Sequence, residues 1–107
     1  MALKDRLSPY NIEDDLLRTE LYREIRAGGE DWKNREISMD EVLMPELTAH
    51  RFYGTDKLKW VVMVAAGLED MREAMEAGSV IRLPSIVWVR QRIRYWMEQE
   101  KKLKARR

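Results

Sequence analysis

The sequence predicts a small, mostly helical α+β domain: two short strands that enclose two helices, followed by a long final helix. Residues 32–37 and 79–83 have the length and side-chain types of short strands. The stretch between them carries helix signals that are interrupted by glycine and proline. Residues 86–104 have the apolar spacing of an amphipathic helix.

The first 35 residues admit three interpretations. Apolar residues at four-residue spacing favour a helix, namely Leu17, Leu21 and Ile25. Gly28-Gly29 would end that helix. The same glycines would also suit the turn of a β-hairpin that pairs the segments on either side. A third alternative is an extended arm that becomes ordered only against a partner. We favour the helix.

The first core helix is marked at both ends. Ser38 and Glu41 form the S-x-x-E capping pattern, which predicts a helical turn. Pro45 is best placed at the first position of a helix over residues 45–53, because its missing N–H costs nothing there. Gly54 then ends the helix and permits the chain to reverse.

The second core helix is expected over residues 57–66. It contains Trp60 and is apolar almost all round, so it should be the central buried element. Residues 68–77 are expected to form a charged turn or short helix. Gly78 then leads into the closing strand through a positive-φ turn, and Pro84 ends that strand.

The final helix separates into three faces when residues are placed 100° apart. One is an ordinary core-facing stripe, formed by Ile86, Val89, Ile93, Trp96 and Met97. Beside it lies a basic stripe of Arg90, Arg94 and Lys101. Trp88 and Tyr95 share a third face, where an aromatic pair would suit an intermolecular contact. In the alternative interpretation the N-terminal segment covers these two rings.

Charge is unevenly distributed along the chain. The net charge is +1, with 20 basic and 19 acidic side chains. Residues 82–107 hold nine basic and two acidic side chains, so the remainder carries −6. A basic end on an acidic body suits assembly between copies or with acidic neighbours. It also leaves a small nucleic-acid-binding protein, using the basic C-terminal helix, as the alternative function.

Several classes of protein are excluded or disfavoured. The 107 residues include no cysteine and one histidine, so neither a disulfide framework nor a multi-histidine metal centre is expected. No apolar run approaches 18 residues, and the first ten residues do not form a secretory signal. We therefore expect no membrane association.

Catalytic patterns are equally sparse. The adjacent carboxylates Glu13, Asp14 and Asp15 would point in different directions on a helix. His50 has no evident catalytic partner, and no phosphate-binding loop or nucleophile elbow occurs. We expect a protein that is not an enzyme and that has no catalytic, cofactor-binding or metal-binding residues.

Two segments carry a family resemblance. Residues 50–62 contain an aromatic residue followed by Tyr53-Gly54, then a polar turn and Trp60 early in the next helix. Residues 76–84 contain Gly78, an alternating strand and Pro84. Together they resemble a LysM-type module, and the set is similar to small tail and baseplate proteins of contractile-tailed bacteriophages.

The resemblance implies an architecture and a function. It implies a LysM-like β-α-α-β core over residues 36–84, an N-terminal arm or helix over 1–35, and a basic amphipathic helix over 85–107. Such proteins are adaptors that bridge tail tube or hub proteins to baseplate wedge proteins, in several symmetry-related copies. The expected location is the virion, after synthesis in the host cytoplasm.

Two differences from the LysM sequence pattern limit what the resemblance implies for this chain. LysM modules that bind peptidoglycan usually open with Gly-Asp-Thr-Leu, where this chain has Ser38-Met39-Asp40-Glu41. They usually have Asn-Pro after the second helix, where this chain has Gly67-Leu68. The resemblance therefore assigns no residue to sugar recognition and supports only the scaffold and the assembly role.

Overall fold

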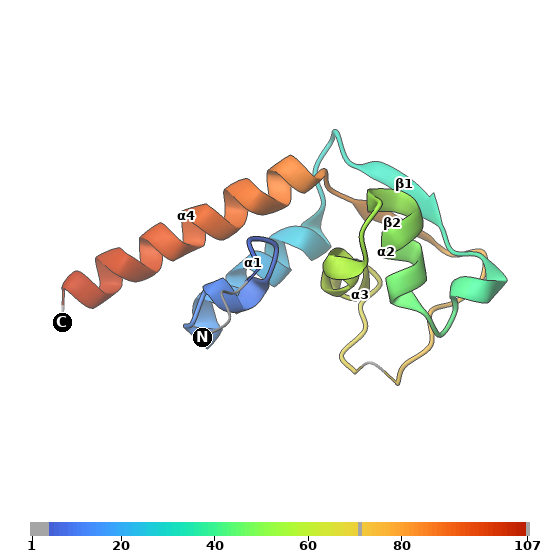
Figure 1. The fold of residues 1–107 in the computed structure, drawn as a ribbon, viewed down its shortest axis with the longest axis horizontal. Helices are drawn as coiled ribbons and strands as arrows, with labels where there is room; N and C mark the ends of the chain where they lie inside the picture. Colours follow the sequence, from blue (N-terminus) through green and yellow to red (C-terminus); the bar gives the residue numbers. More distant parts are fainter. Residues whose placement is uncertain (1–4, 71, 107) are drawn as a thin grey trace.

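This computed structural model describes residues 5–70 and 72–106. Within them the chain folds into four α-helices and two short antiparallel strands (Figure 1). The α-helices and strands are α1 (Asp15–Ala27), β1 (Lys33–Glu36), α2 (Pro45–Tyr53), α3 (Lys59–Ala65), β2 (Val80–Leu83) and α4 (Ile86–Ala105). Single 3₁₀ turns lie at Pro9–Asn11, Met39–Glu41 and Asp56–Leu58. The predicted mostly helical α+β class, with a β-α-α-β core and a long last helix, is confirmed.

The two strands pair along their whole length. Lys33 lies opposite Leu83, and the antiparallel register continues to Glu36 opposite Val80. Gly78 adopts φ +84° just before β2, and its N–H donates to the Ile37 carbonyl at 2.8 Å. The expectation that Gly78 introduces the closing strand through a positive-φ turn is therefore confirmed.

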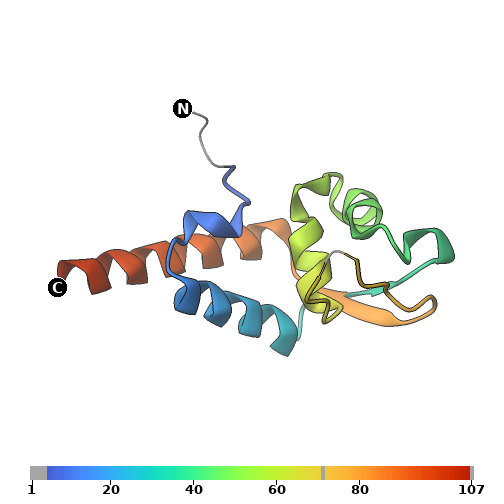
Figure 2. The same cartoon turned by 90° about the horizontal axis from the view of Figure 1, so that it is seen from below.

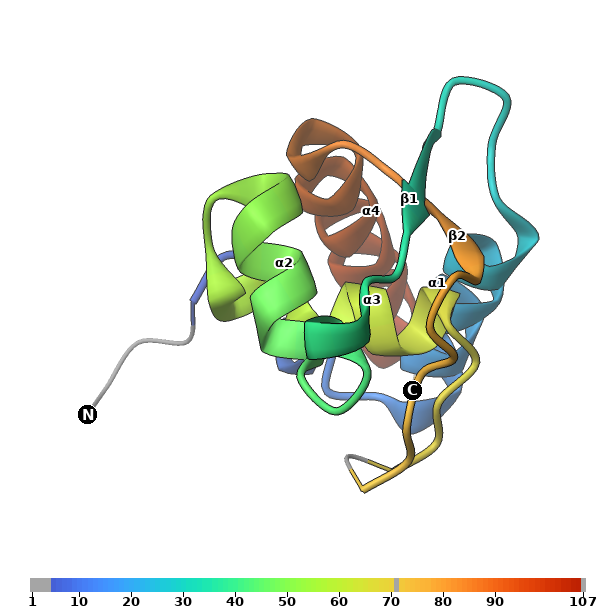
Figure 3. The ribbon, with the colours of Figure 1, turned by 90° about the vertical axis from the view of Figure 1, so that its right-hand side faces the viewer.

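Helices α2 and α3 pack against each other beside the sheet, with their axes steeply crossed (Figure 3). Pro45 is the first residue of α2, and Gly54 ends it in the left-handed region at φ +80°. Val61 and Val62 of α3 are fully buried, and α3 contacts α1, α2 and β2. The prediction that α3 is the central buried element is confirmed.

Two aromatic residues of the core motif make long-range hydrogen bonds. The Tyr53 hydroxyl donates to the Pro84 carbonyl at 2.7 Å, which joins the end of α2 to the end of β2. Burial raises the pKa of Tyr53 above its ordinary value, so the hydroxyl stays protonated as a donor. Trp60 donates from Nε1 to the Leu7 carbonyl at 2.8 Å, which fixes the N-terminal segment against α3.

The N-terminal segment is a helix that belongs to the core. Leu21 and Ile25 of α1 are buried, and Asp14 caps α1 by accepting from the Leu16 and Leu17 N–H groups. The hairpin and extended-arm alternatives are therefore wrong, because this stripe is covered by α3 and α4 of the same chain. With Asp14 as its cap, α1 begins at Asp15.

The segment between α3 and β2 forms turns and bends over the described residues 66–70 and 72–79, without a helix. Its one buried apolar anchor among these residues is Met75, whose N–H donates to the Val42 carbonyl at 2.8 Å. Most of the other described residues in this segment are exposed, so it has no apolar face on which a further helix could pack.

Candidate interaction surface on helix α4

Helix α4 buries the face that its apolar spacing predicts. The Ser85 hydroxyl caps the helix by accepting from the Trp88 N–H at 3.1 Å. Val89 and Ile93 are buried, and further residues of the stripe pack on the core, namely Ile86, Trp96 and Met97. The predicted core-facing stripe is therefore confirmed.

Helix α1 lies alongside α4 (Figure 2). Polar contacts join the two helices at two places along their length. Glu24 of α1 accepts from Trp96 Nε1 at 2.6 Å and from Arg92 Nη2 at 2.5 Å. Near the other end of the pair, Glu100 accepts from the Asp14 backbone N–H at 2.7 Å. The position of α4 is thus set by buried or partly buried carboxylates as well as by apolar packing.

Trp88 is partly covered by its own chain. Its ring meets that of Trp32 edge-on, with the centroids 4.8 Å apart and an interplanar angle of 73°. Trp32 lies in the link between α1 and β1, so for this ring the alternative in which the N-terminal segment covers it is correct. Trp88 is consequently a partly buried packing residue.

Tyr95 remains at the surface. Its side chain is 42% exposed and packs edge-on against Trp96, with the centroids 5.0 Å apart. The Arg92 guanidinium lies over the ring at 4.1 Å from its centroid. Tyr95 therefore presents a supported aromatic face, as an interface residue would.

The different surroundings of Trp88 and Tyr95 lead to a testable difference. Trp88→Ala should lower the free energy of unfolding by about 1–3 kcal/mol, because it removes the contact with Trp32. Tyr95→Ala should cost under about 1 kcal/mol, because that ring is half in water. Urea unfolding of both variants checks this, and equal losses would contradict the assignment of Trp88 to internal packing.

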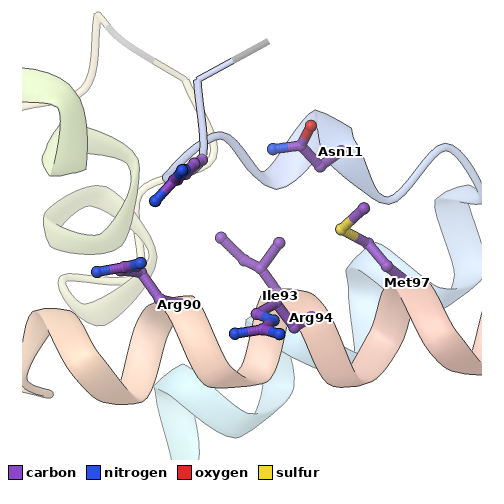
Figure 4. A pocket seen from close by; sticks show the side chains of 6 residues that line it. Asn11, Arg90, Ile93, Arg94 and Met97 are labelled. Atoms are coloured by element: carbon purple, nitrogen blue, oxygen red, sulfur yellow. The ribbon is translucent and has the colours of Figure 1, made fainter.

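The predicted basic stripe divides into two environments. Arg90 and Arg94 line an open pocket of about 400 Å³ together with Arg6 from the N-terminal segment (Figure 4). Its other lining residues are Asn11, Ile93 and Met97. Lys101 lies outside this pocket and pairs with Glu98 at 3.6 Å on the exposed helix surface.

Sequence reasoning missed Arg6 and Asn11. They lie about eighty positions before Arg90 and approach it only because the N-terminal turn packs on α4. No local pattern marks Arg6, so no signal in the sequence could have found it.

A second charged cluster surrounds Glu41, which is fully buried. Its carboxylate pairs with Arg35 and, at 2.9 Å, with Arg51, and it accepts from the Ser38 N–H at 3.2 Å. Burial raises the pKa of Glu41, but these donors outweigh it and hold the pKa below the usual value. Hydrogen bonds from Arg51 and Ser38 likewise lower the pKa of Asp40.

The Glu41 cluster has a structural role. It connects the 3₁₀ turn to β1 through Arg35 and to α2 through Arg51. The capping pattern predicted the turn and the Glu41–Ser38 contact, but it did not predict the two arginines.

No metal-binding arrangement is found among residues 5–70 and 72–106. In that range, no three histidine, aspartate or glutamate side chains are grouped so that they could hold a metal ion. His50 is exposed on α2. None of the described helices is long and apolar enough to span a bilayer.

Comparisons with protein-family models, with curated proteins and with solved structures gave no match.

Proposed function

We propose that this chain is a non-enzymatic assembly protein, an adaptor in the tail baseplate of a contractile-tailed bacteriophage. It would bridge tail tube or hub proteins to wedge proteins through protein–protein contacts, in several symmetry-related copies within the virion. The LysM-like sequence motif at Tyr53-Gly54, Trp60, Gly78 and Pro84 supports the phage assignment. The observed β-α-α-β core is compatible with it.

The observation that carries the adaptor role is the exposed surface of α4. The last turns of α4 project beyond α1, and residues 101–106 are all exposed (Figures 1 and 2). Arg90, Arg94 and Tyr95 are also exposed, on the part of the helix whose other face is anchored in the core. A rigid helix with one anchored face and one charged, aromatic face is a suitable element for a permanent contact.

The alternative, a small nucleic-acid-binding protein, is less well supported. A phosphate-binding strip needs basic side chains that are free of acidic partners. Lys101 pairs with Glu98, and Lys104 pairs with Glu13 at 3.3 Å and with Glu100 at 3.7 Å. These acids weaken the positive potential along the projecting end of α4.

The proposal predicts that the chain is a fixed part of the particle. Mass spectrometry of purified phage should find it at a constant ratio to the sheath protein, and antibody labelling in electron microscopy should place it at the tail end. A host cytoplasmic protein, followed through the same purification, controls for carry-over. Abundant chain in the infected lysate but none in purified particles would contradict the assignment, as would retention on DNA that depends on residues 101–106.

A further inference from the structure

The pocket between α4 and the N-terminal turn is held in place from several sides. Asn11 donates from Nδ2 to the carbonyls of Asp5 at 2.7 Å and Ser8 at 3.0 Å, which closes the turn that carries Arg6. Asp5 also pairs with Lys57 at 2.8 Å, and Trp60 binds the Leu7 carbonyl. Arg6 is therefore carried by an anchored turn.

The three arginines of this pocket carry uncompensated charge. Among residues 5–70 and 72–106, no acidic side chain forms an ion pair with Arg6, Arg90 or Arg94. Arg90 and Arg94 stand four residues apart on one helix face, a spacing at which like charges disfavour the helix. Within the described residues, no ion pair therefore links these three guanidiniums to the stability of the fold. A guanidinium is suited to bind a carboxylate, often through two hydrogen bonds.

The floor of the pocket is apolar. Ile93 and Met97 point from α4 toward the N-terminal segment that carries Asn11 (Figure 4). Ile93 is buried, and the methionine is partly buried and can adapt its shape to a bound side chain. The volume of about 400 Å³ accommodates a few side chains of a peptide, and the pocket is open to solvent.

We propose that this pocket is a docking site for an acidic peptide segment of a partner protein. Two or more carboxylates of that segment pair with Arg6, Arg90 and Arg94, and an aliphatic side chain between them rests on Ile93 and Met97. The proposal rests on the assembly role for the identity of the partner as a protein. It adds the chemistry by which that partner is recognised.

Charge and shape favour a peptide over nucleic acid. The basic groups converge on one pocket and do not continue as a strip, because Lys101 lies elsewhere and is paired with Glu98. The chain outside residues 82–107 carries −6, which would repel a long polyanion that crosses it. A phosphate group offers nothing apolar to contact the floor beneath the arginines, whereas a leucine flanked by glutamates does.

Titration of the full chain with a defined probe tests the site. The probe is a capped pentapeptide with one leucine between two pairs of glutamates, and its analogue has glutamine in place of each glutamate. In heteronuclear NMR the acidic peptide should shift the resonances of Arg90, Arg94 and the Met97 methyl at or below about 10 mM. The double variant Arg90→Gln, Arg94→Gln should weaken binding by about tenfold or more.

Lys102→Gln is the matched control, because it removes a charge from an exposed position of the same helix outside the pocket. It should change the affinity less than about twofold, in keeping with the weak effect of a screened surface charge. The double variant should melt at the wild-type temperature or above it, since it relieves the repulsion between two like charges. An unchanged fold together with lost binding separates recognition from stability.

Four results would overturn the proposal. They are equal binding of the glutamine analogue, an equal loss in Lys102→Gln, absence of shifts throughout the titration, and stronger binding of a short oligonucleotide that depends on the same two arginines. The outcome is distinguishable from failure of the adaptor role. Absence of the chain from phage particles would contradict the adaptor role but would not affect the peptide-binding result. Failure to bind the peptide would contradict the docking site but not the presence of the chain in the particle.

Discussion

Glu41→Ala is expected to lower the free energy of unfolding by about 3 kcal/mol, the largest loss we expect from a single substitution outside the apolar core. The carboxylate is fully buried and is shared by Arg35 and Arg51. Removing it leaves Arg35 partly buried without its counter-charge. Arg51 is 40% exposed and can turn to water, which keeps the loss at the lower end of the range for buried ion pairs.

Urea unfolding followed by circular dichroism measures this loss. Glu41→Gln keeps the shape and some of the hydrogen bonds, so it should cost less than the alanine variant. Glu30→Ala, at an exposed position with no ion pair among the described residues, should change the unfolding free energy by under about 0.5 kcal/mol. Equal stability of wild type and Glu41→Ala would show that the cluster does not support the fold.

The same carboxylate leads to a pH dependence. Because the folded-state pKa of Glu41 is lowered, its contribution is complete above the pKa of the unfolded chain. It is lost as the pH falls through the folded-state pKa. Wild-type stability should therefore fall with acidification below about pH 4.5, while Glu41→Gln should fall less steeply over the same range. Parallel pH profiles would assign the acid sensitivity to other groups.

The core elements were predictable because local signals fix their ends. Pro45 and Gly54 determine where α2 begins and ends, and Gly78 and Pro84 do the same for β2. These residues act through their own backbone preferences, so their effect can be deduced without knowing what packs around them. The N-terminal helix was harder to predict because a diglycine suits both a helix end and a hairpin turn.

The candidate site was only half predictable. Helical spacing correctly grouped Arg90 with Arg94, because four residues make about one turn. It could not show that Trp88 meets Trp32 or that Arg6 completes the pocket, because both contacts depend on how distant segments pack. It also grouped Lys101 with these two arginines, although Lys101 lies outside the pocket and pairs with Glu98. Spacing alone does not show which of its neighbours a lysine will pair with.

The structure also bears on whether residues 36–84 form an independent unit. Inside that range, Leu58, Val61 and Val62 are fully buried, and they belong to the same hydrophobic cluster as residues of α1 and α4. A segment of 49 residues has little core of its own to replace those contacts. We therefore expect the three sequence segments to fold and unfold together as one cooperative domain.

Deleting residues 1–28 is accordingly expected to abolish cooperative folding. The deletion removes Ile12, Leu21 and Ile25, which are buried at 0–2% exposure. Truncating each alone would cost about 2–5 kcal/mol, so together they approach the whole stability of a domain this size, about 5–15 kcal/mol. Thermal unfolding by circular dichroism and the dispersion of NMR amide signals should show no folded state for this variant.

The matched control removes residues 103–107 instead. Those of them that the structure describes are exposed, and Glu100 keeps its hydrogen bond to the Asp14 N–H, so this variant should unfold cooperatively with under about 1 kcal/mol of loss. A segment of residues 32–84, which keeps all of β1, would contradict the expectation if it unfolded cooperatively by itself. The core would then be an autonomous module, and α1 would be held to it only as an appended helix.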